Sequence, residues 1–159
     1  MAVRTYAPMG KTPILKVKLT REHLSVMGGI TPEGKIIMQT QDHSYKGPDV
    51  VRFLQVLTRE IAGKLLVIWD GAPIHRSQVV KDFLAQGGAK RIHLEQLPAY
   101  APELNPQEGV WNLLKRGELK NVCCLEVQHI QTQLRRAKER LRHRKPVLRQ
   151  CFAHAGYFL

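Results

Sequence analysis

The chain has 159 residues and a formal net charge of +12, with 25 Lys and Arg residues against 13 Asp and Glu residues. The length fits one domain with a sizeable core, and no stretch has the length and apolarity of a transmembrane helix or the pattern of a signal peptide. The basic excess favours a polyanionic partner over a membrane surface, and a ribosomal-type basic protein is the alternative. We therefore expect a cytoplasmic protein.

The three cysteines, Cys123, Cys124 and Cys151, form a poor disulfide framework, because their number is odd and two of them are adjacent. His129 and His154 do not complete a zinc-binding spacing with them. We therefore expect reduced, structural thiols.

The first half of the chain predicts a hairpin followed by a helix. Residues 23–30 and 35–40 have strand composition and flank a turn at residues 31–34. Gly47 and Pro48 then open a segment whose apolar residues recur at helical spacing.

Strands and helices alternate in the second half. Residues 65–69 are a continuous apolar run, which is typical of a strand covered on both faces. A helix with Ser77 as its N-cap follows, and residues 92–97 alternate like a strand. The order of elements predicts an α/β fold with an antiparallel hairpin beside a parallel pair of strands.

Two further helices are expected at residues 105–119 and 125–141, both with apolar residues at helical spacing. Pro146 then interrupts the chain after these helices, and a short apolar tail follows. Trp111, in the first of these helices, is expected in the core.

Asp70 ends the apolar run 65–69, where ligands bind in open α/β sheets. Its carboxylate should project into a crevice; the alternative is that it only caps the next turn, as Asp before Gly often does. His75, five residues later, is close enough in sequence to approach a phosphate or orient a water. A hydrogen-bonded structural histidine is the favoured interpretation.

Glu108 lies in the first turn of the helix that starts near Asn105. Asn105, Pro106 and Glu108 also fit a capping box, in which the acid reaches back to the N-cap amide. Glu103, in the loop before the helix, competes with Glu108 as the candidate functional acid. The alternative interpretation of Glu103 is a solvated turn residue.

If Asp70 and Glu108 converge, they could bind Mg²⁺ or Mn²⁺, which prefer hard oxygen ligands. Two such ions about 3.5–4 Å apart activate a water or a 3′-hydroxyl and stabilise the leaving oxygen. A site of this kind needs more carboxylates than these two.

Basic side chains follow the acids. Lys115 and Arg116 lie in the same expected helix as Glu108. Their side chains could contact DNA backbone phosphates, and the alternative is that they are simply solvated. A denser run shares its segment with an apolar face, so its charges can line the other side of one helix and contact DNA phosphates, with a solvated face as the alternative. It comprises Arg135, Arg136, Lys138, Arg140, Arg142, Arg144, Lys145 and Arg149.

Two motifs, VIWDGAPIH at residues 67–75 and LPAYAPELNPQEGVW at residues 97–111, together resemble the catalytic domain of DDE transposases. The branch is that of the bacterial insertion-sequence relatives of the mariner elements, and the similarity runs over nearly all of the chain. It implies a ribonuclease-H-like mixed sheet with flanking helices, and an Asp, Asp and Asp-or-Glu triad that binds two Mg²⁺ or Mn²⁺ ions. Asp70 matches the second acid and Glu108 the third, while Glu103 matches an acid that is not usually a metal ligand.

The first acid of the family has no counterpart. It lies on the first strand, upstream of a segment that resembles residues 4–8, and neither Asp42 nor Asp49 matches it. The helix-turn-helix region that reads the transposon ends is not matched either. The resemblance therefore implies that residues 1–159 form a single, N-terminally truncated catalytic domain whose first strand is incomplete or missing, with a basic C-terminal helix at residues 125–149.

The sequence thus predicts a fragment of a transposase core for DNA cleavage and strand transfer, inactive or nearly so by itself. Its expected partners are transposon-end and target DNA, and a homodimer mate or the upstream transposase segment, in the nucleoid. The alternatives are a DNA-binding remnant that regulates an intact transposase, a structure-selective nuclease of the same fold, and a basic protein with no site.

Overall fold

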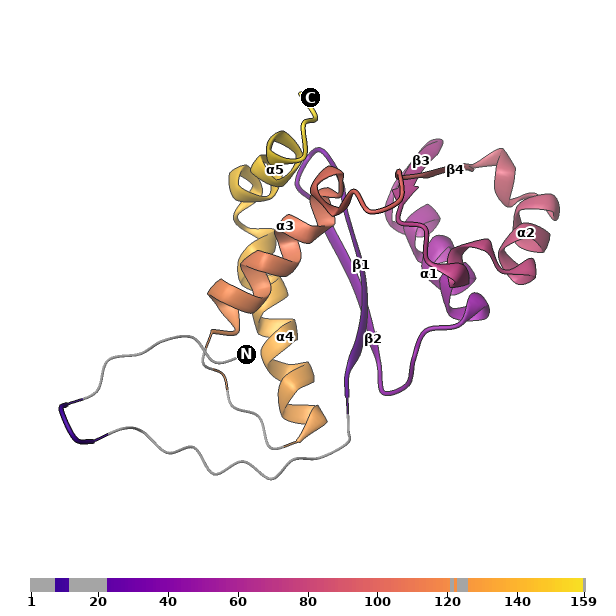
Figure 1. The fold of residues 1–159 in the computed structure, drawn as a ribbon. Coiled ribbons are helices and arrows are strands. Elements are labelled where there is room, and N and C mark those ends of the chain that lie inside the picture. Colours follow the sequence, from indigo (N-terminus) through magenta and orange to yellow (C-terminus); the bar gives the residue numbers. More distant parts are fainter. Residues whose placement is uncertain (1–7, 12–22, 121, 123–125, 159) are drawn as a thin grey trace.

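The computed structural model describes residues 8–11, 23–120, 122 and 126–158, which form two short sheets and a set of helices (Figure 1). Strands β1 (Ser25–Ile30) and β2 (Ile36–Gln41) pair antiparallel, while β3 (Leu65–Trp69) and β4 (Ile92–Gln96) pair parallel. Each pair is a separate two-stranded sheet in this part of the chain. The predicted α/β class, hairpin and parallel pair are all confirmed.

The hairpin turn forms where its sequence predicts it. The Gly34 amide donates to the Thr31 carbonyl at 2.8 Å, and the Thr31 amide donates to Lys35 at 2.9 Å. Gly34 has φ +80°, a conformation that glycine adopts without steric cost. The resulting register places Ile30 opposite Ile36 and Ser25 opposite Gln41.

The helices up to α3 follow the predicted order, and the end of α3 differs from the prediction. Helices α1 (Gly47–Glu60) and α2 (Gln78–Ala85) match the expected segments. Helix α3 (Pro106–Asn112) changes at its end into a π-helical stretch, Leu113–Glu118, which the periodicity did not indicate. Short 3₁₀ turns lie at Pro73–Arg76, Gly88–Lys90 and Pro102–Leu104.

The basic C-terminal segment is two helices and not one. Helix α4 (Val127–Arg142) ends before residues 143–144, and α5 (Lys145–His154) follows. Pro146 therefore lies in the first turn of a helix where the sequence suggested an interruption and a tail, because proline is well suited to the first helical turn. Residue 125, the expected start, lies outside the described residues.

The hairpin lies between two groups of helices, and neighbouring β2 residues face opposite sides (Figure 1). Ile36 packs into a cluster with α3, α4 and α5. Ile37 packs into a second cluster that is built mainly on α1 and includes Val80 of α2 and Ile92 of β4. Each β2 face is therefore covered by helices. Trp111 packs against the first cluster, as expected.

The parallel pair β3–β4 is covered on one face in the described part of the chain. Leu65, Val67 and Trp69 pack against the α1 cluster. Leu66 and Ile68 point the other way and are 62% and 40% exposed. The expectation that this strand is covered on both faces was wrong here: the apolar run follows from strand composition, whereas the cover depends on which elements cross the sheet.

Candidate metal centre

A hollow of about 430 Å³ opens at the carboxyl ends of β3 and β4. Asp70 and Gly71, directly after β3, line one part of it. The loop 97–102 after β4 and two residues of the α3 N-terminus, Asn105 and Glu108, line the rest. The two predicted metal ligands, which come from different motifs, therefore face one hollow.

The Asp70 side chain uses one of its two oxygens to shape the turn. Its Oδ1 atom accepts the backbone N–H of Ala72 at 3.0 Å and lies 3.1 Å from Nδ1 of His75. The Asp70 side chain is 64% exposed, and its Oδ2 atom has no partner among the described residues. The turn-capping alternative is thus correct for one oxygen, while no described residue contacts the second.

His75 lies against Asp70 and the end of β3. Its Nδ1 atom is 3.1 Å from the Asp70 carbonyl oxygen as well as from Oδ1. The ring stacks on Trp69 with centroids 4.4 Å apart and planes 5° apart, and the side chain is only 14% exposed. This is the hydrogen-bonded histidine that the sequence favoured, and its partner is the candidate metal ligand.

The N-terminus of α3 is capped without help from Glu108. The Asn105 side chain accepts the Gln107 amide at 3.0 Å. The Asn105 amide, which a capping box would give to Glu108, donates instead to the Pro102 carbonyl at 3.0 Å. The Glu108 side chain is exposed and has no hydrogen bond or ion pair within the described ranges. The geometry therefore does not support the capping-box alternative, and both Glu108 oxygens are available to a ligand.

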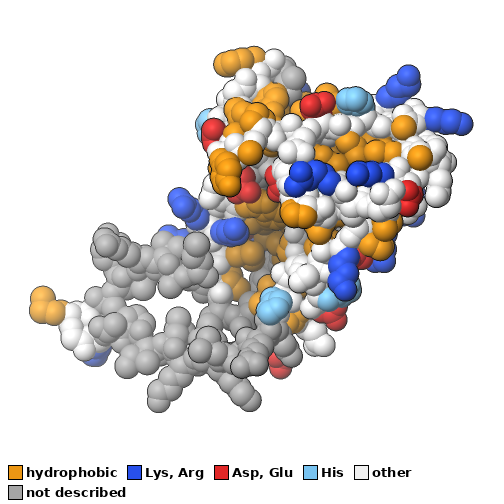
Figure 2. Space-filling model, turned by 45° about the vertical axis from the view of Figure 1, so that its right-hand side comes forward, with side chains coloured by type: hydrophobic (Ala, Val, Ile, Leu, Met, Phe, Trp, Pro, Cys, Tyr) orange, Lys and Arg blue, Asp and Glu red, His pale blue; other side chains and the backbone are white. Residues whose placement is uncertain are grey.

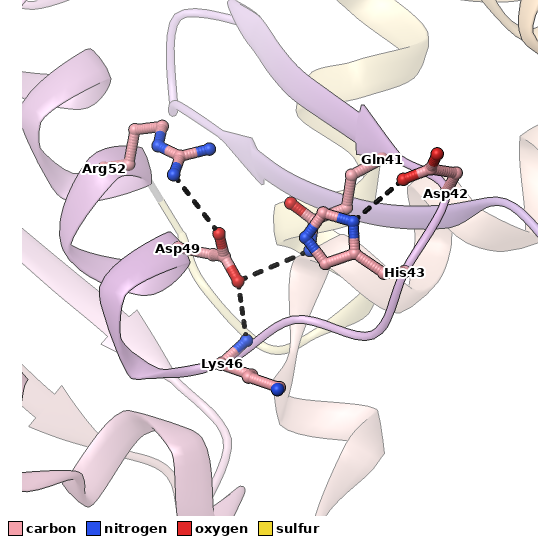
Figure 3. A network of polar contacts seen from close by, with 6 residues as sticks. All are labelled: Gln41, Asp42, His43, Lys46, Asp49 and Arg52. Carbon is pink, nitrogen blue, oxygen red and sulfur yellow. Dashed lines mark hydrogen bonds and ion pairs between the residues drawn. The ribbon is translucent and has the colours of Figure 1, made fainter.

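The other acids that the sequence raised lie elsewhere. Glu103 is exposed in the turn Pro102–Leu104 and does not line the hollow. Asp42 is exposed and pairs with His43 at 2.8 Å. Asp49 accepts the Lys46 amide at 2.9 Å and lies 3.5 Å from Arg52 (Figure 3).

Asp49 is a structural residue at the start of α1. The pKa of Asp49 lies below the usual value for an aspartate. The hydrogen bond from the Lys46 backbone amide is the main cause, and the Gln41 side chain and the charge of Arg52 add to it. The network in Figure 3 uses both Asp49 oxygens. This is consistent with the expectation that Asp49 is not the first acid of the triad.

Comparison with known protein families identifies the family of this chain. A family model described as DDE superfamily endonuclease matches residues 2–130. This chain belongs to that family. No curated protein matches it in sequence.

Solved structures of a mariner transposase share the fold of this DDE superfamily endonuclease. The Mos1 mariner paired-end complex with Mn aligns over 100% of this chain and 52% of its own, with 15% identity and a TM-score of 0.63. The catalytic domain of Mos1 mariner transposase aligns over 87% of this chain and 82% of its own, with 13% identity and a TM-score of 0.54. The chain thus spans about half the length of the Mos1 transposase in the paired-end complex, and the predicted ribonuclease-H-like fold is confirmed.

The donor set of the hollow suits a hard divalent ion, since Asp70 and Glu108 each have a carboxylate oxygen that no described residue contacts. The described residues contain no cluster of three His, Cys, Asp or Glu side chains that could hold a metal. Asp70 and Glu108 are therefore two candidate ligands, and no third one joins them among the described residues.

The predicted basic residues divide into paired and unpaired groups. Glu118, whose side chain is 13% exposed, accepts Arg140 at 2.6 Å and Arg144 at 3.2 Å, and Arg142 pairs with Glu139 at 3.3 Å. Arg149 donates to the Pro32 carbonyl at 3.3 Å. The remaining candidates have no ion pair within the described part of the chain: Lys115, Arg116, Arg135, Arg136, Lys138 and Lys145.

The basic surface is broad. Figure 2 shows Lys and Arg side chains spread over one face, with exposed hydrophobic side chains between them. Arg135 and Lys138 line a second hollow, of about 400 Å³, between α4 and β2. Among the described helices, none is long and apolar enough to cross a membrane.

Two residues, Tyr100 of the hollow and Gln107 beside Glu108 in α3, have features that the sequence analysis did not find. Gln107, next to Glu108, has a buried side-chain amide with no hydrogen-bond partner in the described structure. Tyr100 is fully exposed in the loop 97–102 and has φ +58°. Neither feature has a signal in composition or periodicity, because the backbone angle of Tyr100 and the burial of Gln107 depend on the tertiary structure.

The third cysteine behaves as predicted. Cys151 is buried in the first core cluster, and burial raises the pKa of its thiol. Its Sγ atom donates to the Val147 carbonyl at 3.6 Å. The other two cysteines, Cys123 and Cys124, lie outside the described residues.

Proposed function

We propose that this chain is the catalytic-core part of an insertion-sequence transposase, and that Asp70 and Glu108 hold a divalent metal for phosphodiester cleavage and strand transfer. One observation carries the proposal: the two acids come from separate motifs, line the same hollow, and each keep an oxygen without a partner in the described structure. Mg²⁺ or Mn²⁺ bound there would activate a water or 3′-hydroxyl and stabilise the leaving oxygen. In the complete enzyme the ions would number two.

The residues around the acids have defined parts in this proposal. Asp70 and Glu108 are the metal ligands, His75 orients Asp70, and Glu103 is accessory at most. DNA, as transposon ends and target, is the substrate, and the unpaired basic residues of α4 bind its backbone phosphates. We place the protein with the nucleoid in the cytoplasm, paired with a second copy or with an upstream transposase segment.

Residues 1–159 would then be one partial catalytic domain, inactive or nearly so by itself. The reason is chemical: the described residues bring two acids together, and no third ligand joins them. A nicking assay of the 159-residue chain with a supercoiled plasmid and Mn²⁺ tests this. We expect no cleavage above the level of the Asp70→Asn variant; robust nicking that Asp70→Asn abolishes would contradict it.

Metal binding tests the site separately from cleavage. Mn²⁺ titration followed by electron paramagnetic resonance should show weak binding that is lost in both Asp70→Asn and Glu108→Gln. Glu103→Gln is the matched control, since this exposed acid lies outside the hollow. Unchanged Mn²⁺ binding in Asp70→Asn and Glu108→Gln would overturn the proposal.

A DNA-binding regulator without catalysis is the second candidate, and the incomplete acid set favours it. It predicts DNA binding that weakens with salt, persists in Asp70→Ala, and is the same in Mn²⁺ and in EDTA. DNA affinity that rises with Mn²⁺ and falls in Asp70→Ala would exclude it in favour of the metal-dependent core.

A further inference from the structure

The loop 97–102 combines an unusual backbone with an unusual side chain at Tyr100. Among the described residues, Tyr100 is the one non-glycine residue with a positive φ, at +58°. Side chains other than Gly, Asn and Asp rarely adopt this left-handed conformation, because Cβ crowds the backbone. The strain is not offset by packing, since the Tyr100 side chain is fully exposed.

The loop that carries Tyr100 is held at both ends. The Leu97 amide donates to the Trp69 carbonyl at 2.9 Å and continues the β3–β4 pairing. At the other end, the Leu104 amide donates to Ala101 at 3.1 Å. Pro98 and Pro102 restrict the backbone between these anchors. The aromatic ring is thus displayed from a fixed support.

The hollow beside Tyr100 has two chemically different parts. Asp70, Asn105 and Glu108 supply its polar groups. The loop supplies an apolar wall from Leu97 to Pro102, in which Tyr100 is the aromatic member. A nucleotide has the same two parts, a phosphate and a flat apolar base, joined by a sugar.

We propose that Tyr100 is a stacking platform for one unpaired DNA base next to the phosphate at Asp70 and Glu108. The inference rests on the proposed function for the position of the phosphate. An exposed aromatic face binds bases of any sequence by stacking, whereas a paired base in a duplex has both faces covered by its neighbours. The site therefore selects DNA that is frayed or single-stranded at the reacting position.

The experiment compares wild type with Tyr100→Asn and Tyr100→Phe. Asn tolerates a positive φ and lacks a ring, while Phe keeps the ring without the hydroxyl. The probe is a duplex with a short unpaired 3′ flank that carries 2-aminopurine, and its control is the same sequence fully paired. Binding is measured in Mn²⁺ by fluorescence quenching of the 2-aminopurine.

We expect Tyr100→Asn to weaken binding of the flanked duplex roughly 5- to 100-fold and to lose the quenching. Tyr100→Phe should behave like wild type, and the paired duplex should bind all three proteins equally. The melting temperature of Tyr100→Asn should be unchanged or higher, because the substitution relieves strain without removing packing. Equal binding by Tyr100→Asn and wild type, or equal losses for flanked and paired DNA, would overturn the inference.

The two proposals fail in different measurements. Tyr100→Asn should titrate with Mn²⁺ as wild type does, since its side chain supplies no metal ligand. Normal Mn²⁺ binding with quenching that does not depend on Tyr100 refutes the stacking platform alone. Absent Mn²⁺ binding refutes the metal site, whatever the quenching shows.

Discussion

The Nδ1 atom of His75 lies 3.1 Å from Oδ1 of Asp70 and 3.1 Å from the carbonyl oxygen of the same residue. Both neighbours are acceptors, so Nδ1 carries the proton and donates it between them. The ring is held in this orientation by its stack on Trp69. Trp69, Asp70 and His75 thus form one local unit in which the end of β3 orients its own carboxylate.

Replacing His75 should weaken metal binding without unfolding the protein. In His75→Phe the aromatic stack on Trp69 can persist, but the hydrogen bond to Asp70 is lost. Partners that orient a metal ligand typically change metal affinity 10- to 100-fold, and we expect about 10-fold here because Asp70 is largely exposed. Mn²⁺ titration measures the change. His75→Asn, which can still donate a hydrogen bond, is the control, and equal Mn²⁺ affinity in His75→Phe and wild type would contradict the orienting role.

Glu118 fixes the junction of α4 and α5 to the π-helical stretch. Its shielded carboxylate accepts Arg140 and Arg144, one on each oxygen. Glu118→Gln should lower the free energy of unfolding by about 1–2 kcal/mol, because two charged partners lose a shielded acceptor. Glu139 contacts Arg142 and His143 in pairs that are largely exposed. Glu139→Gln, which removes both pairs, should lower the free energy of unfolding by under about 0.5 kcal/mol. Urea unfolding measures the free energy of unfolding of both variants. Similar losses in the two would contradict the view that the shielded Glu118 pairs contribute more stability than the exposed Glu139 pairs.

Two adjacent glycines of β1 should respond differently to alanine. A Cβ at Gly28 would lie 2.9 Å from Gln107 Nε2 and 2.9 Å from the Trp111 ring, while one at Gly29 would meet Phe53 at 3.7 Å. Gly28→Ala should therefore destabilise the protein by about 1–3 kcal/mol through overpacking. Gly29→Ala should be neutral or stabilising, since alanine loses less entropy in a strand. Thermal unfolding compares the two, and a larger loss in Gly29→Ala would contradict this packing.

Asp49 should contribute to stability at neutral pH and not in acid. Its pKa in the folded protein lies below the usual value, chiefly through the Lys46 amide. The folded state then favours the charged form, so its stabilisation is present above about pH 4 and is lost as the pH falls through the lowered pKa. Asp49→Asn should lose about 1 kcal/mol at pH 7 and converge with wild type near pH 2. Urea unfolding from pH 2 to 7 measures this.

The control for Asp49 is Asp42→Asn. His43 holds the pKa of Asp42 below its usual value as well, but this pair is exposed to solvent. Solvent screens such a pair, so the difference from wild type should be small at every pH. A pH-dependent loss in Asp42→Asn as large as that in Asp49→Asn would assign acid sensitivity to surface pairs instead of the α1 network.

Local signals predicted the elements of this fold better than their surroundings. The turn at Gly34, the proline at the start of α1 and the apolar run of β3 depend on neighbouring residues, and each formed as expected. The exposed face of Leu66 did not follow, because burial depends on which elements cross the sheet. The helix that starts at Lys145 was missed because a proline can either end a helix or occupy the first turn of a new one.

The candidate site divides in the same way. The position of Asp70 after a strand and of Glu108 in a first helical turn could be predicted from spacing. Spacing could not predict whether the Glu108 carboxylate caps its own helix. The Asn105 amide, which such a cap would need, donates to the Pro102 carbonyl instead. The left-handed Tyr100 was likewise invisible, because its conformation follows from the two anchored ends of its loop.

The two groups of basic residues should differ in their effect on DNA binding. Arg135 and Arg136 are exposed on α4 and have no ion pair within the described ranges, so they are free to meet phosphates. Each phosphate contact that is lost lowers the slope of log affinity against log salt by about 1. The double variant Arg135→Gln, Arg136→Gln should therefore reduce the slope by about 2, as measured by fluorescence anisotropy with duplex DNA.

A matched pair on another surface separates local contact from overall charge. Lys81 is exposed on α2, and Lys90 is exposed at the end of the 3₁₀ turn Gly88–Lys90 that follows α2. The hairpin β1–β2 lies between α2 and α4 (Figure 1). Replacing both with Gln removes the same charge as the Arg pair. If α4 contacts the phosphates, the Lys pair should leave the slope nearly unchanged, since distant exposed charges are screened at physiological salt. Equal reductions for both pairs would mean that net charge, and not the α4 surface, sets DNA affinity.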